Sequence, residues 1–108
     1  MKYYTKDHVW LQQDNETGRL EIGITVQGNA ALDNSITFVE TSDGKLFVES
    51  VKKVFELKLP VKGVLYDTVI GVPAGEWDED LLVASYDPGY ELDTSQCMDE
   101  EAYRKYVE

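Results

Sequence analysis

The stretch LFVESVKKVFELK, residues 46–58, decides the expected architecture of this chain. Apolar and polar residues alternate through residues 46–50 and again through Val54–Lys58, which is the pattern of strands with one buried face. Only three residues, 51–53, separate the two runs. A connection this short between alternating runs predicts a tight antiparallel hairpin whose apex projects into solvent.

Further short β-runs, separated by turn-forming residues, extend on both sides of this hairpin. We expect the other strands over Val9–Gln13, 19–25, 36–40, 64–72 and, as the last strand of the chain, 81–86. We expect turns or loops over 14–18, 42–44, 60–63, 73–80 and 87–89 from their glycine, proline, asparagine and aspartate content. The sequence therefore predicts a small, mostly antiparallel β fold.

Two minor helices complete the expected fold. One short helical segment is expected over 26–32, and a C-terminal helix is expected over 99–107. Acidic residues open the second helix and Arg104 and Lys105 lie near its end, an order that suits the helix dipole. The length of 108 residues fits a single domain spanning residues 1–108.

The net charge of the chain limits the kinds of molecule that it is expected to bind. The chain has 10 basic and 21 acidic residues, a net charge of -11. A nucleic-acid partner is not expected, because binding phosphates requires a positively charged surface. The charge favours a partner with a basic docking surface, although a merely soluble acidic domain has the same composition.

The apolar runs and the first residues bear on localisation. Every apolar run is far too short to span a membrane, so no membrane partner is expected. The first seven residues are polar and unlike a secretory signal, which predicts a cytoplasmic protein. The single cysteine, Cys97, has no partner for an internal disulfide and is expected to be chemically incidental.

Two lysines, Lys52 and Lys53, occupy the apex of the predicted hairpin. Lysines at such a place are commonly solvated charges that oppose aggregation. An exposed amine on a hairpin is also accessible to a modifying enzyme, and acylation of that amine would remove its charge. Spacing alone leaves both interpretations open.

The residues around the apex resemble a known swinging-arm signature. The segments ESVKK, residues 49–53, and LPVKG, residues 59–63, are similar to the lipoyl-attachment region of the glycine cleavage system H protein family. In that family the modified lysine follows a glutamate by three residues and precedes a proline by eight. Lys52 meets both spacings, to Glu49 and to Pro60.

The resemblance extends along most of the chain. YTKDHVW at 4–10, GIT at 23–25, AL at 31–32, FVE at 38–40 and EAYRKY at 101–106 follow one another in the family's order. The resemblance implies a barrel-sandwich hybrid of the lipoyl/biotinyl type, built from two antiparallel sheets. It also implies a carrier that is not itself an enzyme, with no catalytic residues and no metal site of its own.

The resemblance also implies the cofactor and the partners. Lipoate would be attached covalently to Lys52 by a lipoate ligase or lipoyl transferase that recognises Glu49. The arm would accept an aminomethyl group from glycine decarboxylase, pass it to the aminomethyltransferase and be reoxidised by dihydrolipoamide dehydrogenase. Biotin is disfavoured as cargo, because biotin carriers have methionines beside the lysine and this chain has Val51 and Lys53 there.

Several departures from the family bear on glycine cleavage itself. Val9 stands where the family has a glutamate implied to hold the loaded arm in a cleft, while Asp7 and Glu56 remain nearby by motif position. The stretch 40–49 is shorter than in the family, and a later family motif is reduced to residues 73–77. Two alternatives therefore stay open: an H-like paralogue serving lipoate relay or another redox pathway, and an unmodified binding module.

The histidine and the aromatic residues have mainly structural interpretations. His8 is expected to have a structural role at an N-terminal strand, and a dyad with Asp7 is not expected because strand neighbours face opposite sides. Four apolar residues are expected in the core or on a sheet face: Trp10, Phe38, Phe55 and Leu57. Trp77, in a predicted loop, fits either partner contact or the core.

Overall fold

The computed structural model describes residues 2–31, 37–42, 44–50, 54–75 and 78–108. Its elements are β1 (Lys2–Tyr4), β2 (Val9–Gln13), β3 (Leu20–Ile24), α1 (Val26–Ala31), β4 (Phe38–Ser42), β5 (Lys45–Glu49), β6 (Val54–Lys58), β7 (Val61–Lys62), β8 (Leu65–Gly75), β9 (Asp78–Tyr86), β10 (Glu91–Leu92) and α2 (Glu100–Tyr106). The mostly β fold with a short helix after the third strand and a C-terminal helix is confirmed. Leu32, at the end of the first expected helix, lies outside the described residues.

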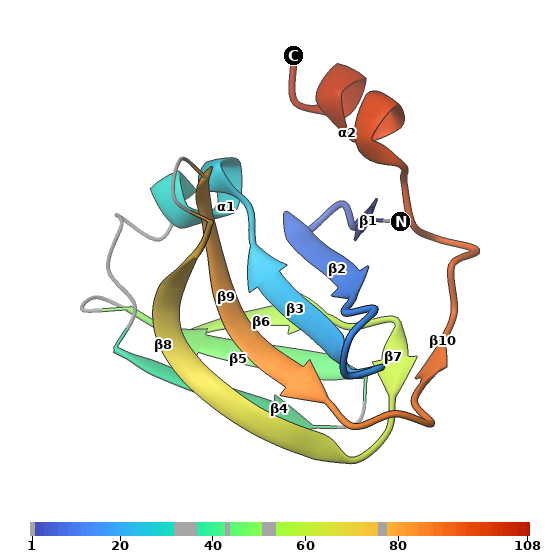
Figure 1. Cartoon of the computed structure of the whole chain (residues 1–108). Coiled ribbons are helices and arrows are strands. Elements are labelled where there is room, and N and C mark those ends of the chain that lie inside the picture. Colours follow the sequence, from blue (N-terminus) through green and yellow to red (C-terminus); the bar gives the residue numbers. More distant parts are fainter. Residues whose placement is uncertain (1, 32–36, 43, 51–53, 76–77) are drawn as a thin grey trace.

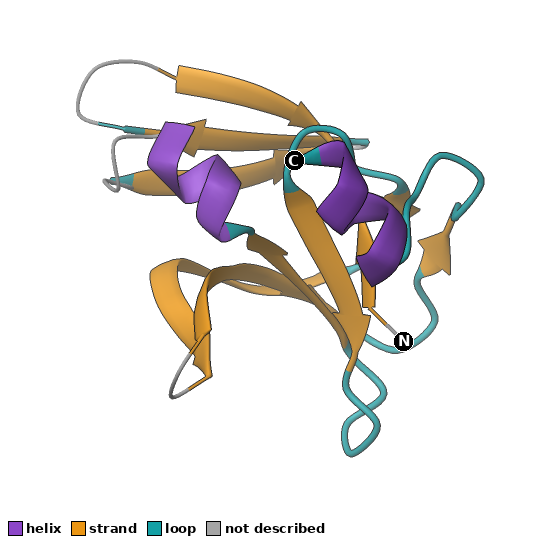
Figure 2. Ribbon diagram, turned by 90° about the horizontal axis from the view of Figure 1, so that it is seen from above, coloured by secondary structure: helices purple, strands orange, loops and turns teal. Residues whose placement is uncertain are grey.

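The strands form two main antiparallel sheets and a small third one. The larger sheet has the order β1-β2-β3-β9-β8, the second has the order β4-β5-β6, and β10 pairs with β7. Figures 1 and 2 show the two larger sheets on opposite sides of the molecule, and both helices lie toward the top in Figure 1. This agrees with the barrel-sandwich class, and the β7–β10 pair is an addition to the two sheets expected.

The core lies between the two larger sheets. Strand alternation in the five-stranded sheet turns Leu11 and Ile22 inward, and alternation in β5 turns Leu46 and Val48 inward. These four side chains are fully buried in one cluster. Burying an aliphatic side chain of this size contributes about 1.5–3 kcal/mol, so the contact between the sheets is the main source of stability.

The hairpin predicted from residues 46–58 is confirmed. β5 and β6 pair antiparallel, with Glu49 opposite Val54 and Lys45 opposite Lys58. β2 has the predicted bounds, and β4 begins two residues later than expected. The alternating pattern located these strands because each has one face on the core.

The loop predicted over 73–80 is wrong. β8 continues to Gly75 and β9 begins at Asp78, with Gly75 opposite Asp78 and Pro73 opposite Leu81. β8 is an edge strand whose pairing with β9 has several register shifts, and edge strands with irregularities tolerate proline and glycine. The pairing of β8 with the next strand, β9, therefore extends further than the local composition indicated.

The prediction of a turn over 60–63 is wrong, and so is the prediction that 81–86 is the last strand of the chain. Val61 and Lys62 form β7, which pairs with β10, a strand that follows β9 in the chain. Val61 is buried and belongs to the main core. Two-residue strands are too short to leave a periodic signal, so this pairing was hidden in the sequence.

The C-terminal helix α2 has the expected charges at its ends. The Asp99 carboxylate caps it by accepting a hydrogen bond from the Ala102 N–H at 2.8 Å. The Tyr103 ring stacks on the Tyr4 ring with centroids 4.5 Å apart. Tyr4, Tyr103 and the buried Trp10 form a second, smaller core beneath the helix.

Candidate functional site

The β5–β6 hairpin is the candidate carrier element. The pairing of Glu49 with Val54 makes residues 50–53 the connection between the two strands (Figure 1). Lys52 and Lys53 fall within 51–53, outside the described residues, and the choice of Lys52 as attachment point therefore stays a prediction. The strands that lead into this connection and out of it are described on both sides.

The hairpin is held firmly up to its last paired residues. Leu46 and Val48 on β5 are fully buried, and Phe55 and Leu57 on β6 pack against the same core. A slip of one residue would turn these side chains outward, so burial fixes the register. The carbonyl of Glu49 also accepts hydrogen bonds from the Thr37 N–H at 2.8 Å and the Thr37 hydroxyl at 3.1 Å. The connection therefore begins from a rigid base.

Glu49 is exposed at the end of β5. Its neighbours across the strands are Phe38 on β4 and Val54 on β6. Its position next to the connection is compatible with the predicted recognition by a lipoylating enzyme, and that role stays a prediction.

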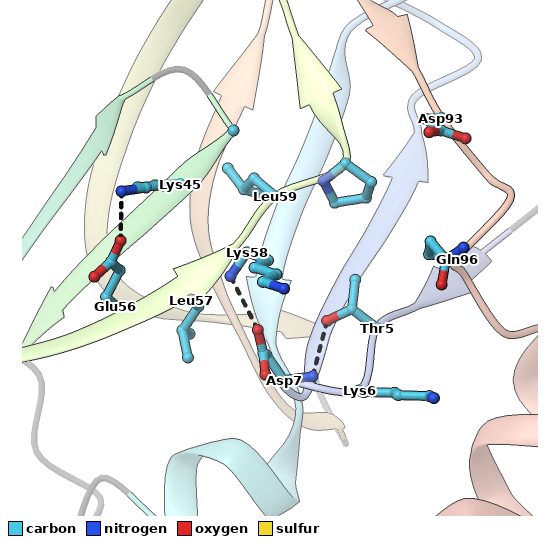
Figure 3. A pocket seen from close by; sticks show the side chains of 12 residues that line it. Thr5, Lys6, Asp7, Lys45, Glu56, Leu57, Lys58, Leu59, Asp93 and Gln96 are labelled. Atoms are coloured by element: carbon cyan, nitrogen blue, oxygen red, sulfur yellow. Dashed lines mark hydrogen bonds and ion pairs between the residues drawn. The ribbon is translucent and has the colours of Figure 1, made fainter.

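An open groove of about 990 Å³ lies between the β1–β2 turn, the start of β5 and the end of β6 (Figure 3). Its lining comprises Thr5, Lys6, Asp7, Gly44, Lys45, Glu56, Leu57, Lys58, Leu59, Pro60, Asp93 and Gln96. Asp7 and Glu56, which the sequence analysis named as the carboxylates remaining nearby by motif position, both line it. The fold thus brings together the two carboxylates that sequence reasoning singled out.

Both carboxylates already have partners. Oδ2 of Asp7 accepts a hydrogen bond from the Lys58 backbone N–H at 3.0 Å, which ties the β1–β2 turn to the end of β6 (Figure 3). Oε1 of Glu56 lies 2.8 Å from Nζ of Lys45 in an ion pair. Both side chains of this ion pair are about half exposed, so it adds at most about 1 kcal/mol to stability.

A smaller pocket of about 170 Å³ adjoins the groove. Its lining comprises Lys6, Asp7, His8, Ile24, Gly28, Phe55 and Leu57, of which Lys6, Asp7 and Leu57 also line the groove. Together the two hollows follow β6 from Phe55 to Lys58, a distance of about 10 Å at the usual rise of a strand.

Val9 does not line either hollow. Its side chain is fully buried in the main core, between the sheets. Val9 therefore contributes an apolar side chain to the core and no carboxylate to either hollow. The charged side chains of the larger groove are three lysines and three carboxylates: Lys6, Lys45, Lys58, Asp7, Glu56 and Asp93. Hydrogen bonds from Ser95 hold the pKa of Asp93 below its usual value.

His8 lies in the turn between β1 and β2 and not in a strand, as its φ of 65° requires. Its Nδ1 is hydrogen-bonded to the Tyr103 hydroxyl at 2.7 Å. The same hydroxyl lies 2.7 Å from Oγ1 of the buried Thr25. The structural interpretation of His8 is confirmed, and the premise that it sits in a strand is wrong. The Tyr103 network was missed, although the EAYRKY motif contains Tyr103.

The aromatic side chains divide between core and surface. Trp10 is buried, whereas Phe38 is half exposed on the outer face of the three-stranded sheet. Phe55 and Leu57 are partly buried against the core. The other tryptophan, Trp77, lies outside the described residues.

In the described part of the chain, no group of three or more histidine, cysteine, aspartate or glutamate side chains is arranged to hold a metal ion. No described helix has the length and apolar character needed to cross a membrane.

The chain is similar to a curated glycine cleavage system H protein from Acidobacterium capsulatum. The two are 39% identical over 71 residues, a match that covers 57% of this chain and 53% of that protein. The chain thus spans about half the length of the curated relative that it matches, and no family model matches it. The match confirms the resemblance seen in the motifs.

Proposed function

We propose that this chain is a carrier protein that holds lipoate as an amide on Lys52. The observation that carries the proposal is the strand register, in which Glu49 opposite Val54 leaves residues 50–53 as the connection of a core-anchored hairpin. The similarity to an H protein supports a lipoyl-carrier role. The spacings to Glu49 and Pro60 select Lys52 and not Lys53.

The groove along β6 is within reach of an arm attached at this connection. A lysine side chain extended by a lipoyl group has roughly ten bonds of about 1.5 Å, a reach on the order of 12 Å. Phe55 to Lys58 spans a comparable length of strand. The arm would lie along the partly buried Phe55 and Leu57, which would shield it from water.

The lipoyl group, when attached, supplies a dithiolane that accepts a group together with an electron pair and recloses on oxidation. The chain's own residues present and house the arm. The buried face of the hairpin keeps the attachment point in place, and the Asp7–Lys58 hydrogen bond keeps the groove walls together. Asp7 and Glu56 would be the acidic groups nearest to a loaded arm.

Glycine cleavage is the pathway that the relative's name indicates. We propose glycine decarboxylase, the aminomethyltransferase and dihydrolipoamide dehydrogenase as successive partners of the arm. A second candidate is an H-like carrier for lipoate relay or another redox pathway. It is favoured by Val9, because that position contributes to the core and supplies no carboxylate to hold a cationic aminomethyl group.

Intact-mass measurement after co-expression with a lipoate ligase tests the attachment. The wild-type chain and Lys53→Arg should each gain one lipoyl group, whereas Lys52→Arg should gain none. If Lys52→Arg is modified and Lys53→Arg is not, the attachment point is wrong by one residue. A wild-type chain that never gains the group would leave the unmodified binding module as the better reading.

Glycine-dependent bicarbonate exchange separates the two pathways. The lipoylated chain is mixed with glycine decarboxylase, glycine and labelled bicarbonate, with an established H protein as the positive control. Exchange above the background of the unlipoylated chain supports glycine cleavage. A fully lipoylated sample that supports none favours the other lipoate-dependent pathways.

A further inference from the structure

The β1–β2 turn, residues 5–8, forms one wall of both hollows. Thr5, Lys6 and Asp7 line the groove, and His8 joins Lys6 and Asp7 in lining the smaller pocket. The turn is bonded internally, because the Thr5 hydroxyl accepts hydrogen bonds from the N–H groups of Asp7 and Val9 at 3.2 and 3.3 Å. Whatever anchors this turn therefore also places the wall.

The backbone of His8 shows that the turn is held from outside. Its φ of 65° lies in the left-handed region, which residues other than glycine rarely adopt and which persists only where the surroundings enforce it. The His8 carbonyl accepts a hydrogen bond from the Thr25 N–H at 3.0 Å. A Cβ added to Gly28 of α1 would lie 2.9 Å from the His8 Cβ, so the histidine is seated closely against that helix.

The C-terminal helix α2 contacts the turn at two points. Tyr103 and Tyr106 are three residues apart and therefore share one face of the helix. The Tyr103 hydroxyl is hydrogen-bonded to Nδ1 of His8 at 2.7 Å, and the Tyr106 hydroxyl donates a hydrogen bond to the Lys6 carbonyl at 3.2 Å. Both tyrosine rings lie beside the His8 ring, with centroids 5.9 and 6.0 Å from it. Tyr106 is 47% exposed, so its hydroxyl can be removed with little effect on the core.

The turn is attached to β6 on its other side. β6 is an edge strand of the three-stranded sheet. The Leu59 N–H bonds to the Gly44 carbonyl on the β5 side, so the preceding Lys58 N–H points to the open edge. There the Asp7 carboxylate accepts it at 3.0 Å (Figure 3). Hydrogen bonds thus connect α2, through the turn, to the opposite wall of the groove.

We propose that Tyr103 and Tyr106 are positioning residues for the arm, which hold the β1–β2 turn where Asp7 closes the groove onto β6. This inference rests on the proposed function, in which the arm lies along Phe55 and Leu57. Neither tyrosine lines the groove or the smaller pocket, so both act through the turn. Loosening α2 lets the turn separate from β6, which opens the groove and leaves the hairpin anchored in the core.

The first test is amide hydrogen exchange of the unmodified chain, followed by NMR. The Lys58 N–H reports the contact between the turn and β6, because Asp7 is its acceptor, and the Val48 N–H on the central strand β5 reports opening of the hairpin itself. Tyr106→Phe removes the hydroxyl and keeps the ring. Tyr66→Phe is the matched control, because Tyr66 is 52% exposed and lies on β8, at the opposite edge of the five-stranded sheet from β1.

Tyr106→Phe should speed exchange at Lys58 about fivefold, a factor expected for the loss of one hydrogen bond, and should leave exchange at Val48 unchanged. Asp7→Ala should speed exchange at Lys58 at least as much. The double variant should exchange no faster than Asp7→Ala, because the tyrosine acts through Asp7 and the two effects are then not additive. Tyr66→Phe should match the wild type at both amides.

The second test follows the arm in the lipoylated chain. Leu57 lines both hollows, so its methyl NMR signals should move when the wild type or Tyr66→Phe is lipoylated. Tyr106→Phe and Asp7→Ala should each reduce that movement, because a loosened wall houses the arm for less of the time. Thermal unfolding of each variant, followed by circular dichroism, separates this effect from a general loss of stability.

Exchange at Lys58 that is equal in Tyr106→Phe and the wild type overturns the proposal. Equal acceleration at Lys58 and Val48 overturns it too, because the tyrosine would then only stabilise the domain. A lipoylated Tyr106→Phe chain with the full movement at Leu57 also overturns it, while the carrier function stands. A wild type that gains lipoate without any movement at Leu57 removes the role of the groove and of α2 but leaves the attachment intact. A wild type that never gains lipoate, as seen by intact mass, removes the carrier function and this inference with it.

Discussion

Replacing Leu46 by alanine tests whether the candidate carrier hairpin is held by the core. Leu46 is fully buried on β5, the central strand of the three-stranded sheet, and belongs to the cluster that joins both larger sheets. The substitution removes three carbons and leaves a cavity that the surrounding strands fill only in part. For Leu→Ala in a core this costs about 2–5 kcal/mol, and we expect about 3 kcal/mol here.

That loss is a large share of the total stability. A chain of this size has a free energy of unfolding on the order of 5–15 kcal/mol, so Leu46→Ala should remain folded at 25 °C. Its unfolding midpoint should fall by roughly 12–24 °C, given 4–8 °C per kcal/mol for small domains. Urea titration at 25 °C and thermal scans, both followed by circular dichroism, measure the two quantities.

The control is Val64→Ala, at an exposed position, which should change stability by less than about 0.5 kcal/mol. A loss below 1 kcal/mol for Leu46→Ala would refute the view that the inner face of the hairpin is locked in the core. Lipoylation of the folded Leu46→Ala chain at 25 °C should match the wild type, because the substitution leaves the exposed face of the hairpin intact. A large drop there would show that the hairpin loosens before the domain unfolds.

Two further predictions address the rest of the molecule. Tyr103→Phe removes the hydroxyl that bonds His8 and the buried Thr25, and it should lower the free energy of unfolding by about 1–3 kcal/mol in urea titrations; an unchanged midpoint would contradict the assigned network. Burial raises the pKa of Glu21, so its charged form is disfavoured in the folded state. Protonated Glu21 therefore favours the folded state. Its contribution to the free energy of unfolding is fully present below the pKa that Glu21 has in the unfolded chain, and it is lost as the pH rises through the raised pKa of the folded chain. Glu21→Gln should therefore shift the urea midpoint upward at pH 7 and leave it unchanged at acidic pH, where both side chains are neutral; a shift that persists in acid would refute this cause.

The proposed function has two parts, the attachment of lipoate and the use of the arm. The proposed attachment depends on the hairpin and on the spacing around Lys52. The proposed use of the arm depends on the groove, where Asp7 accepts a backbone N–H and Glu56 pairs with Lys45. The mass and exchange measurements address these two parts independently.

The sequence by itself determined the features that depend on local pattern. Alternation over 46–58 located a hairpin anchored on one face, and the acidic start and basic end of α2 located the C-terminal helix. The spacing of Lys52 to Glu49 and Pro60 is likewise a property of the chain alone. These features can be predicted without the tertiary structure, because each depends on residues that lie within about ten positions of one another.

The tertiary structure alone decided what depends on distant segments. The pairing of β7 with β10 joins segments that lie far apart in the chain. β8 and β9 are consecutive strands, and their pairing extends to Gly75 and Asp78 despite the turn-forming composition, while β9 pairs on its other side with the distant β3. In the groove, Asp7 reaches Lys58, 51 residues away. Three strands bring Phe38, Glu49 and Val54 onto one face of the second sheet. The sequence pattern does not show which of these distant residues become neighbours, because burial and hydrogen bonding bring them together only when the chain folds.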